Sequence, residues 1–285
     1  MRRVTLVPNP TKDLELKITK RVIDKLKSLG FTPCLERRYD FLSELGIDFY
    51  DSPYTDSEFI IVIGGDGTVI DASSLALELD IPLLGVNLGK VGYLVEVDPN
   101  ELDTLDRLLS GDFIIEEKML LSVEKYSREN SKTTSSRLAV NDVVVSHGNY
   151  LGITDFTVEN QKEDHVRFRA DGVIVSTPQG STAYSLSAGG PIISHTLDCI
   201  TVTPVCPHSF FNRAIVYGAE EKIKISNCAE TVVNVSIDGR LFATLEKDEY
   251  CVVEKSEKRM KMITLGESNV FSTLSKKIKS MQDIL

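Results

Sequence analysis

The sequence predicts an α/β N-terminal domain with a parallel sheet, followed by an all-β sandwich as the C-terminal domain. Two observations predict this fold class. Over the first hundred or so residues, short β-rich runs alternate with apolar residues at helical spacing, the pattern of a parallel sheet with crossover helices. After Phe113 the helical period nearly disappears, and short runs recur between turn residues, which is typical of an antiparallel sandwich.

The first domain is expected to alternate strands with helices. After a first strand at Val4–Val7, apolar residues recur every three or four positions from Leu14 to Leu29, and Gly30 stands where a left-handed helix cap belongs. The elements expected next are strands at Phe31–Leu35, Phe59–Ile63 and Leu83–Val86, a helix after Gly67, and a last helix at Leu102–Leu109 that stops at Gly111.

The second domain is expected to be built from short strands. These are placed at Leu120–Glu124, Val143–Ser146, Val166–Phe168, Val173–Val175, Ile200–Val202, Ile223–Ile225 and Val233–Ile237, with helical character only near Thr182–Ser187. From Val270 to Ile284 the apolar residues return to helical spacing, so we expect a C-terminal helix that packs back on the first domain. The domains are therefore placed at residues 1–111, joined by 266–285, and at 112–265.

Composition limits the class of protein. Of the 285 residues, 42% are hydrophobic and 26% charged, which fits a packed soluble protein of one large or two moderate domains. No run approaches the ~18 apolar residues of a membrane span, and Met1–Pro10 lacks the core of a secretory signal. We therefore expect a cytoplasmic protein that does not act at a membrane.

The charge and cysteine counts exclude further classes. With 32 basic and 42 acidic residues the formal net charge is −10, which disfavours a nucleic-acid partner. An anionic ligand would need a local positive field from backbone N–H groups, a helix N-terminus or a bound metal ion. The five cysteines are an odd number without a Cys-x-x-Cys pair, so neither a disulfide framework nor a zinc site is indicated.

The sharpest local signal is Gly64-Gly65-Asp66-Gly67-Thr68, which lies between the apolar strand and a helical pattern that begins at Val69. Ligands bind at such strand-to-helix turns in open α/β folds, because glycines and helix-opening N–H groups let a phosphate approach. Asp66 departs from that pattern. It either acts on a metal or a substrate hydroxyl, or it caps the following helix, and the turn alone favours neither.

The turn is not one of two common phosphate-binding motifs. A P-loop would end in Gly-Lys-Ser/Thr, and the dinucleotide motif Gly-x-Gly-x-x-Gly would need a glycine where Val69 stands. A second signal is the run from Asp171 to Pro191, in which a strand leads to a Pro-Gln-Gly turn, hydroxyl-bearing residues and a double glycine. Such a run suits a ribose or phosphate site, although by composition it is more often a solvated loop.

Together these segments resemble the NAD kinase family, which phosphorylates the adenosine ribose 2'-hydroxyl of NAD to give NADP. The resemblance rests on the Gly64–Thr68 turn, the pair Asn141-Asp142, the run Asp171–Pro191 and Pro204–Ser209, in this order and spacing, and extends from Phe59 onward. The Gly-Gly-Asp-Gly-Thr element alone is not specific, because lipid kinases and phosphofructokinases share it. The long run is much more specific.

The resemblance implies roles for individual residues. Asp66 matches the aspartate that accepts the proton of the 2'-hydroxyl, the pair Asn141-Asp142 contacts the substrate, Asp171 matches an acidic position facing it, and Arg169 lies at a possible substrate contact. The full set expected at the site is Gly64, Gly65, Asp66, Gly67, Thr68, Tyr93, Asn141, Asp142, Arg169, Asp171, Thr182, Ala183, Tyr184, Ser185, Leu186 and Ser187. In the family the NAD site lies between the two domains, and the protein is a homo-oligomer.

Several of these residues also have simpler explanations. The pair Asn141-Asp142 could form a turn before a strand, and Tyr93 could stack on a base or pack in the core. None of the four histidines has metal-ligand spacing, and none is assigned a catalytic role.

The sequence also departs from the family pattern. Asp71, Ser73 and Ser74 stand where a basic residue is common, which puts a phosphate clamp on that helix in doubt. Gln179 stands where threonine is usual, and Arg240 stands where some relatives have glutamine.

The expected function is that of an NAD kinase that takes the terminal phosphoryl of ATP, with Mg²⁺ offsetting the charge of the reactants. Two alternatives stay open. A lipid kinase could share the first domain, although the second-domain motifs are small and polar rather than apolar. A dinucleotide sensor could keep the pocket without turnover. The choice of ATP or polyphosphate, and of NAD or NADH, is open as well.

Overall fold

The computed structural model describes residues 2–52, 56–89, 92–148, 152–162, 164–208, 212–266 and 273–275. Contacts divide these residues into two compact units. The first contains the described residues of Met1–Glu117 and Met260–Leu285, and the second contains those of Lys118–Arg259. The chain passes from one unit to the other within two long strands, Ile114–Tyr126 and Tyr250–Thr264. The boundaries expected from the sequence, at 111–112 and 265–266, place both strands in the second domain. Those boundaries stay a prediction.

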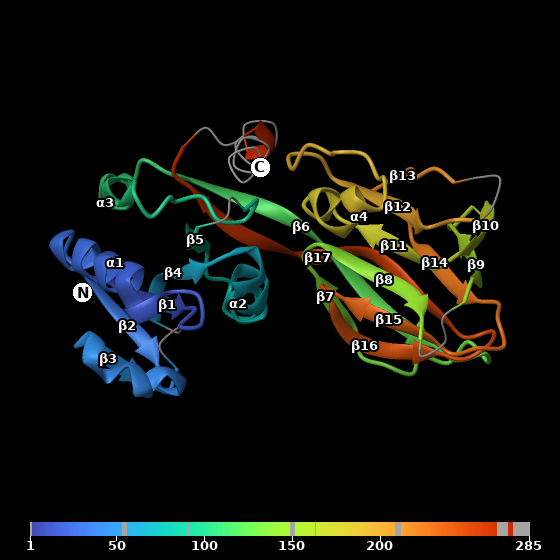
Figure 1. The fold of residues 1–285 in the computed structure, drawn as a ribbon, viewed down its shortest axis with the longest axis horizontal. Helices are drawn as coiled ribbons and strands as arrows, with labels where there is room; N and C mark the ends of the chain where they lie inside the picture. The colour runs from blue at the N-terminus through green and yellow to red at the C-terminus, as the bar shows by residue number, and fades with distance from the viewer. Residues whose placement is uncertain are drawn as a thin grey trace. The chain divides into compact units, whose positions relative to one another are not determined.

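The first unit is α/β, as expected, and its sheet is parallel (Figure 1). Its elements are β1 (Arg2–Pro8), α1 (Lys17–Ser28), β2 (Phe31–Glu36), β3 (Asp48–Tyr50), β4 (Ser57–Gly64), α2 (Asp66–Leu79), β5 (Leu83–Asn87) and α3 (Asp106–Ser110), with 3-10 turns at Leu14–Leu16, Arg37–Leu45 and Leu102–Leu105. The strand order is β5-β4-β1-β2-β3, and every pair in it is parallel.

Helices cover both faces of this sheet because its central strands are apolar on both sides. In β4, Ile61 and Ile63 face a core that they share with Val22 and Leu26 of α1 and with Leu105, next to α3. The alternate residues Ile60 and Val62 are equally buried but lie outside that core, and α2 packs against β4 and β5 with its own buried residues. A continuous apolar run is what a strand buried on both faces requires.

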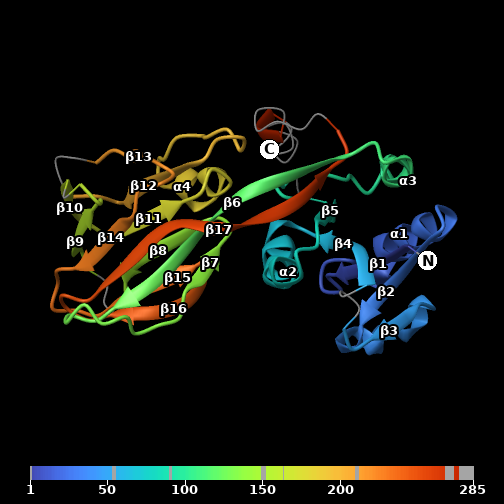
Figure 2. The same ribbon diagram turned by 180° about the vertical axis from the view of Figure 1, so that it is seen from behind.

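The second unit is a sandwich of two antiparallel layers. Its strands are β6 (Ile114–Tyr126), β7 (Arg137–Ala139), β8 (Asp142–His147), β9 (Thr154–Glu159), β10 (His165–Ala170), β11 (Gly172–Ser176), β12 (Cys199–Val205), β13 (Ile215–Gly218), β14 (Ile223–Asn227), β15 (Val233–Ile237), β16 (Arg240–Leu245) and β17 (Tyr250–Thr264). One sheet has the order β13-β12-β11-β8-β15-β16. The other contains β10-β9-β14-β17, and β17 pairs with β6, which lies beside it in Figure 2.

Both sheets bury their inward side chains in one core. Val143 and Val175 come from the first sheet and Phe156 and Phe168 from the second, and all four are completely buried. Alternation of buried and part-exposed residues along β9 and β14 follows from having one face in the core.

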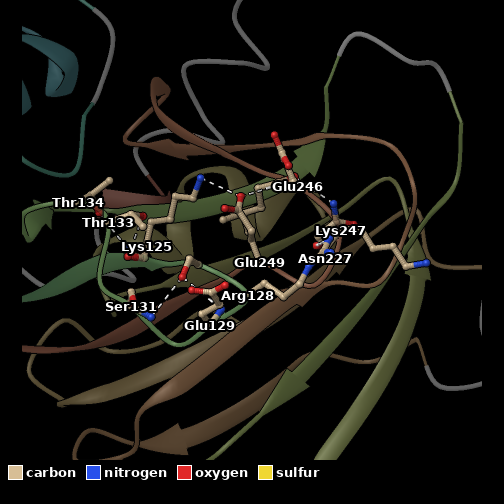
Figure 3. A network of polar contacts seen from close by, with 12 residues as sticks. Lys125, Arg128, Glu129, Ser131, Thr133, Thr134, Asn227, Glu246, Lys247 and Glu249 are labelled. Atoms are coloured by element: carbon tan, nitrogen blue, oxygen red, sulfur yellow. Dashed lines mark hydrogen bonds and ion pairs between the residues drawn. The ribbon is translucent and has the colours of Figure 1, made fainter.

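A network of polar contacts links residues 125–134 with Asn227 and with residues 246–249 of this unit (Figure 3). The Lys125 ammonium lies 2.8 Å from the Glu249 carboxylate, and both side chains are largely buried. Arg128 donates a hydrogen bond of 2.8 Å to the carbonyl of Lys247, and the backbone N–H of Asn227 donates to the carbonyl of Glu249 at 3.0 Å. The hairpin turn at residues 246–249 is therefore held by contacts from two other turns.

The structure differs from the sequence-based prediction at some elements. The helix after the glycine turn begins at Asp66 rather than near Val69. The short strands β3, β7, β9, β13 and β16 and the long β17 were not predicted. The expected C-terminal helix over 270–284 lies outside the described residues, apart from 273–275. Among the described residues, no helix is both long enough and apolar enough to traverse a bilayer.

Candidate functional site

In the first unit, the strand order reverses between β1 and β4. From β1 the chain continues to β2 and β3 on one side, and β4 and β5 lie on the other. Open α/β sheets bind ligands at this switch point, outside the carboxyl ends of the strands. The loop after β1 and the turn after β4 meet here, because the Asn9 N–H donates to the carbonyl of Ile63 at 2.9 Å.

The glycine turn forms the opening of α2. Gly65 is the N-cap residue, and its carbonyl accepts the first helical hydrogen bonds from Thr68 and Val69. A Cβ on Gly64 would stand 2.4 Å from the Thr68 hydroxyl, so only glycine fits there. Gly67 is exposed, and a Cβ on it would have no atom within 4 Å. The turn therefore presents open space and free N–H groups of a 14-residue helix, which favour an anion.

Asp66 does not cap α2, so the capping explanation of this residue is wrong. The helix has no side-chain cap, and the carboxylate turns instead to the loop after β5. Its two oxygens each accept one backbone hydrogen bond of 2.9 Å, from Tyr93 and from Leu94. A Cβ on Gly92 would stand 2.2 Å from an Asp66 oxygen, so the loop approaches this carboxylate as closely as a glycine allows. Each oxygen keeps a lone pair for a further donor.

Tyr93 therefore reaches the site through its backbone N–H. Burial raises the pKa of the Tyr93 hydroxyl, and the neighbouring Asp66 charge acts in the same direction. The side chain is half-buried, and its proposed stacking on a base stays a prediction.

Sequence reasoning missed two residues of this site, both in the loop after β1. The side-chain amide of Asn9 donates to the Thr68 hydroxyl at 3.0 Å. The Nζ atom of Lys12 lies 3.8 Å from the point where a Cβ on Gly65 would stand, so an exposed cation lies next to the glycine turn. On α2 itself, where the sequence has no basic residue, Ser73 is buried and donates to the carbonyl of Ile70. The signal available was that Asn9-Pro10 directly follows the first strand.

In the second unit, the pair Asn141-Asp142 stands at the start of β8. Asp142 is 5% exposed. Burial, together with the neighbouring Asp238 carboxylate, raises the pKa of Asp142 to about 7. Burial also raises the pKa of Asp238, but that carboxylate accepts three backbone hydrogen bonds, which act in the opposite direction. The proton of the pair is therefore assigned to Asp142 below about pH 7.

The long run beginning at Asp171 is ordered against the same pair. It forms β11, a turn with a 3-10 segment at Gly180–Thr182, and the four-residue helix α4 (Tyr184–Ser187). The carbonyl of Asn141 accepts the Thr177 N–H at 2.9 Å, and a Cβ on Gly180 would stand only 2.0 Å from that carbonyl. The residues of this turn are buried, unlike those of a solvated loop.

The other predicted residues of the second unit lie around this turn or at the β10–β11 junction. Thr182 and Ser185 are buried, whereas Tyr184 and Ser187 are exposed. Ser185 shares a hydrogen bond of 2.9 Å with Thr203. Gln179 is buried too, and its amide makes a long contact of 3.5 Å with the carbonyl of His195.

Arg169 and Asp171 flank the end of β10. Arg169 is exposed, and its carbonyl accepts the His208 N–H at 2.7 Å. The carbonyl of Asp171 accepts the His147 N–H at 3.1 Å. The structure therefore gathers the predicted residues into two groups, one in each unit: the glycine turn with Tyr93 in the first, and the Asn141-Asp142 pair with the long run in the second.

No group of three or more His, Cys, Asp or Glu side chains that could hold a metal ion is found in the part of the chain that the structure describes. A magnesium ion that enters with a nucleotide needs only one or two carboxylates, since phosphates and water supply its other ligands. Asp66, beside the glycine turn, is such a carboxylate. The donor set fits a metal carried by the substrate better than one held in a protein cage.

Comparisons with known proteins agree over both units. The ATP-NAD kinase N-terminal domain family matches residues 33–113, and the ATP-NAD kinase C-terminal domain family matches residues 140–265. The chain is 34% identical to an NAD kinase of Thermoanaerobacter sp. (strain X514), covering 98% of this chain and 99% of the relative. It is also 34% identical to an NAD kinase of Natranaerobius thermophilus, with both chains covered completely.

Two solved structures share the fold. Yeast NADH kinase in complex with NADH superposes with a TM-score of 0.86 at 21% identity, covering 98% of this chain and 88% of the other. An NAD kinase from Archaeoglobus fulgidus in complex with ATP superposes with a TM-score of 0.73 at 24% identity, covering 98% and 99%.

Proposed function

The chain belongs to the NAD kinase family, and from this membership we propose that it transfers the terminal phosphoryl of ATP to the adenosine ribose 2'-hydroxyl of NAD. The observation that carries the proposal is the placement of Asp66 beside the glycine turn at the β1–β4 switch point. Phosphoryl transfer needs mainly positioning and charge stabilisation, together with a base that receives the proton of the attacking hydroxyl. Asp66 has a lone pair on each oxygen for that hydroxyl.

The donor phosphates are assigned to the first unit. N–H groups that open α2 and the Lys12 ammonium supply a local positive field, which a protein with a net charge of −10 otherwise lacks. NAD is assigned to residues of the second unit: Asn141, Asp142, Arg169, Asp171 and the segment 182–187. When bound, Mg²⁺ would offset the charge of the phosphates, which together with water would supply most of its ligands.

Replacing Gly67 with Ala tests whether a phosphate approaches the backbone at this residue, because the change should affect ATP binding without harming folding. Gly67 is the second residue of α2, its φ is not positive, and a Cβ would meet no atom within 4 Å. We expect the variant to gain roughly 0.4–1 kcal/mol of stability, because alanine restricts the unfolded chain. The KM for ATP should rise, because the methyl group occupies space that a phosphate needs.

Thermal unfolding and steady-state kinetics check both expectations. The control is Gly111→Ala, at a positive φ of 73°, which should lose stability with an unchanged KM. An unaltered KM for ATP in the Gly67 variant would place the phosphates elsewhere.

Replacing Lys12 with Ala tests the cation beside the turn. The KM for ATP should rise about tenfold, the effect of one charge-assisted hydrogen bond to a phosphate. The KM for NAD should change little, because Lys12 is assigned to the donor. Lys17→Ala is the control, since Lys17 is an exposed lysine at the start of α1. Equal kinetics in the two variants would remove Lys12 from the donor site.

The activity itself is tested by incubating the protein with MgATP and either NAD or a diacylglycerol. NADP formation, read with an NADP-specific dehydrogenase, is the expected result. Phosphorylation of the lipid alone would support the lipid-kinase alternative. Calorimetric NAD binding without NADP from ATP or polyphosphate, and with NADH also tried as acceptor, would support a sensor. A homodimer or homotetramer and a cytoplasmic location stay predictions, and light scattering tests the first.

A further inference from the structure

Asp238 contacts the backbone of the Asn141-Asp142 segment, and no motif in the sequence predicted this contact. Its Oδ2 atom accepts the N–H of Val140 at 2.9 Å. Its Oδ1 atom accepts the N–H groups of Asn141 at 2.8 Å and of Asp142 at 3.1 Å. One carboxylate thus binds three successive backbone amides from almost a hundred residues away in the sequence.

The contact is reciprocal. The Asp238 N–H donates to the carbonyl of Asp142 at 3.0 Å, so the turn that carries Asp238 and the start of β8 hold one another. Asp238 has a φ of +47°, in the left-handed region that most residues avoid and that aspartate tolerates. Gly239 follows with a φ of +79°, which gives the tight Asp-Gly turn between β15 and β16.

The opposite side of the same backbone is also fixed. The Thr177 hydroxyl donates to the carbonyl of Val140 at 2.7 Å, and the Thr177 N–H donates to the carbonyl of Asn141 at 2.9 Å. Gly180 lies against that carbonyl with no room for a Cβ. The amides of residues 140–142 are therefore held by Asp238, and two of their carbonyls are held by the long run.

A turn of this shape does not by itself require such a carboxylate. Asp248 also has a positive φ, of 64°, in the next hairpin turn of the same unit. Its carboxylate lies on the surface, 3.7 Å from Arg128. The difference lies in what the side chain binds: Asp238 binds the segment that carries Asn141 and Asp142, and Asp248 does not.

We propose that Asp238 is a positioning residue that fixes the Asn141-Asp142 pair in the orientation in which the pair binds NAD. The inference rests on the proposed role of that pair in NAD binding. Asp238 acts through the backbone of residues 140–142 and does not itself touch the substrate. Thr177 is its partner on the other side of the segment.

The test is Asp238→Asn. Asparagine keeps the size and the left-handed backbone but retains only one acceptor oxygen, so at least one of the three amides loses its partner. We expect the KM and the calorimetric Kd for NAD to rise roughly tenfold, the size of one lost hydrogen bond. The kcat and the KM for ATP should stay within about threefold. Asp248→Asn, the same change in the matched turn, should leave all of these values unchanged.

A double-mutant cycle separates positioning from general loosening of the fold. In an Asn141→Ala background, Asp238→Asn should raise the KM for NAD by much less than in the wild type, because the group being positioned is gone. Full additivity, or a wild-type KM in Asp238→Asn itself, would overturn the proposal.

Hydrogen exchange of the wild type covers the case in which the variant does not fold. Slow exchange is expected for the amides of Val140, Asn141 and Asp142, and exchange as fast as in an open loop would overturn the proposal. If the wild type binds NAD but forms no NADP, the proposed function is wrong. The role of Asp238 can still be tested in that case, because the NAD affinities of wild type and variant can be compared without turnover.

Discussion

Asp66→Asn lowers the kcat for NADP formation by about 100-fold or more, the usual effect of losing a general base. The amide cannot receive the proton of the 2'-hydroxyl, whereas the carboxylate can. Affinity for NAD should stay within a few-fold, because NAD is assigned mainly to residues of the second unit. The loss should therefore appear in kcat rather than in the calorimetric Kd.

The structure adds a second effect that has to be separated from the first. Both Asp66 oxygens accept loop N–H groups, from Tyr93 and Leu94. In the Asn variant one of these N–H groups faces an NH₂ group, which costs about 1–3 kcal/mol where it is buried. The loop at Gly92 should loosen locally, and hydrogen exchange of the Tyr93 and Leu94 amides measures that change.

Two further variants show whether the loss of turnover comes from the missing base or from the disturbed loop. Gly92→Ala disturbs the loop but keeps the carboxylate, since its Cβ would stand 2.2 Å from an Asp66 oxygen. If Asp66 acts as the base, this variant should lose less kcat than Asp66→Asn. Asp106→Asn, at the first residue of α3, is the matched control for an aspartate in a first helical turn and should keep full activity. Wild-type turnover in Asp66→Asn would exclude Asp66 from the mechanism.

The sequence predicted the parts of the site that depend on local pattern. A glycine turn after an apolar strand places Gly64–Thr68 at the end of β4, because strand and helix periods change there. It also predicted that Asn141 and the long run belong to one group, since both were part of the family resemblance. The contact of Thr177 with Asn141 agrees with that grouping.

The parts that were missed depend on partners far away in the sequence. Lys12 belongs to the site only because β1 lies beside β4 in the sheet, and Asp238 only because β15 lies beside β8. Neither pairing can be read from spacing along one segment. Strand β17 was missed because Lys255, Glu257 and Lys258 interrupt the alternation that would identify it. Edge strands such as β16 were missed because they bury little apolar surface.

Asp142→Asn should stabilise the protein at alkaline pH while weakening NAD binding. An aspartate has an ordinary pKa of 3.8, and burial next to Asp238 raises the pKa of Asp142 to about 7. Since the folded state holds a proton that the unfolded state releases, the contribution of Asp142 is fully present below about pH 4 and is lost as the pH rises through about 7. At pH 8 the wild type therefore folds with a charge that its surroundings disfavour.

The size of the effect follows from the two pKa values. At about 1.4 kcal/mol for each unit of the shift from 3.8 to about 7, the penalty is on the order of 4 kcal/mol at pH 8. Asparagine carries no charge, so Tm at pH 8 should rise by several degrees in a chain of this length. Near pH 4 wild type and variant should unfold at about the same temperature. Scanning calorimetry from pH 4 to 8.5 measures the difference directly.

The pH dependence of this gain is what identifies its cause. Asp248→Asn removes one negative charge from an exposed turn and should show no gain that grows with pH. A gain in the Asp142 variant that is equal at pH 4 and pH 8 would mean that packing, and not the buried charge, is responsible. If NAD binding weakens in the same variant, Asp142 contributes to ligand binding although it lowers the stability of the fold at alkaline pH. The buried carboxylate beside Asp238 would then have a role in binding rather than in folding.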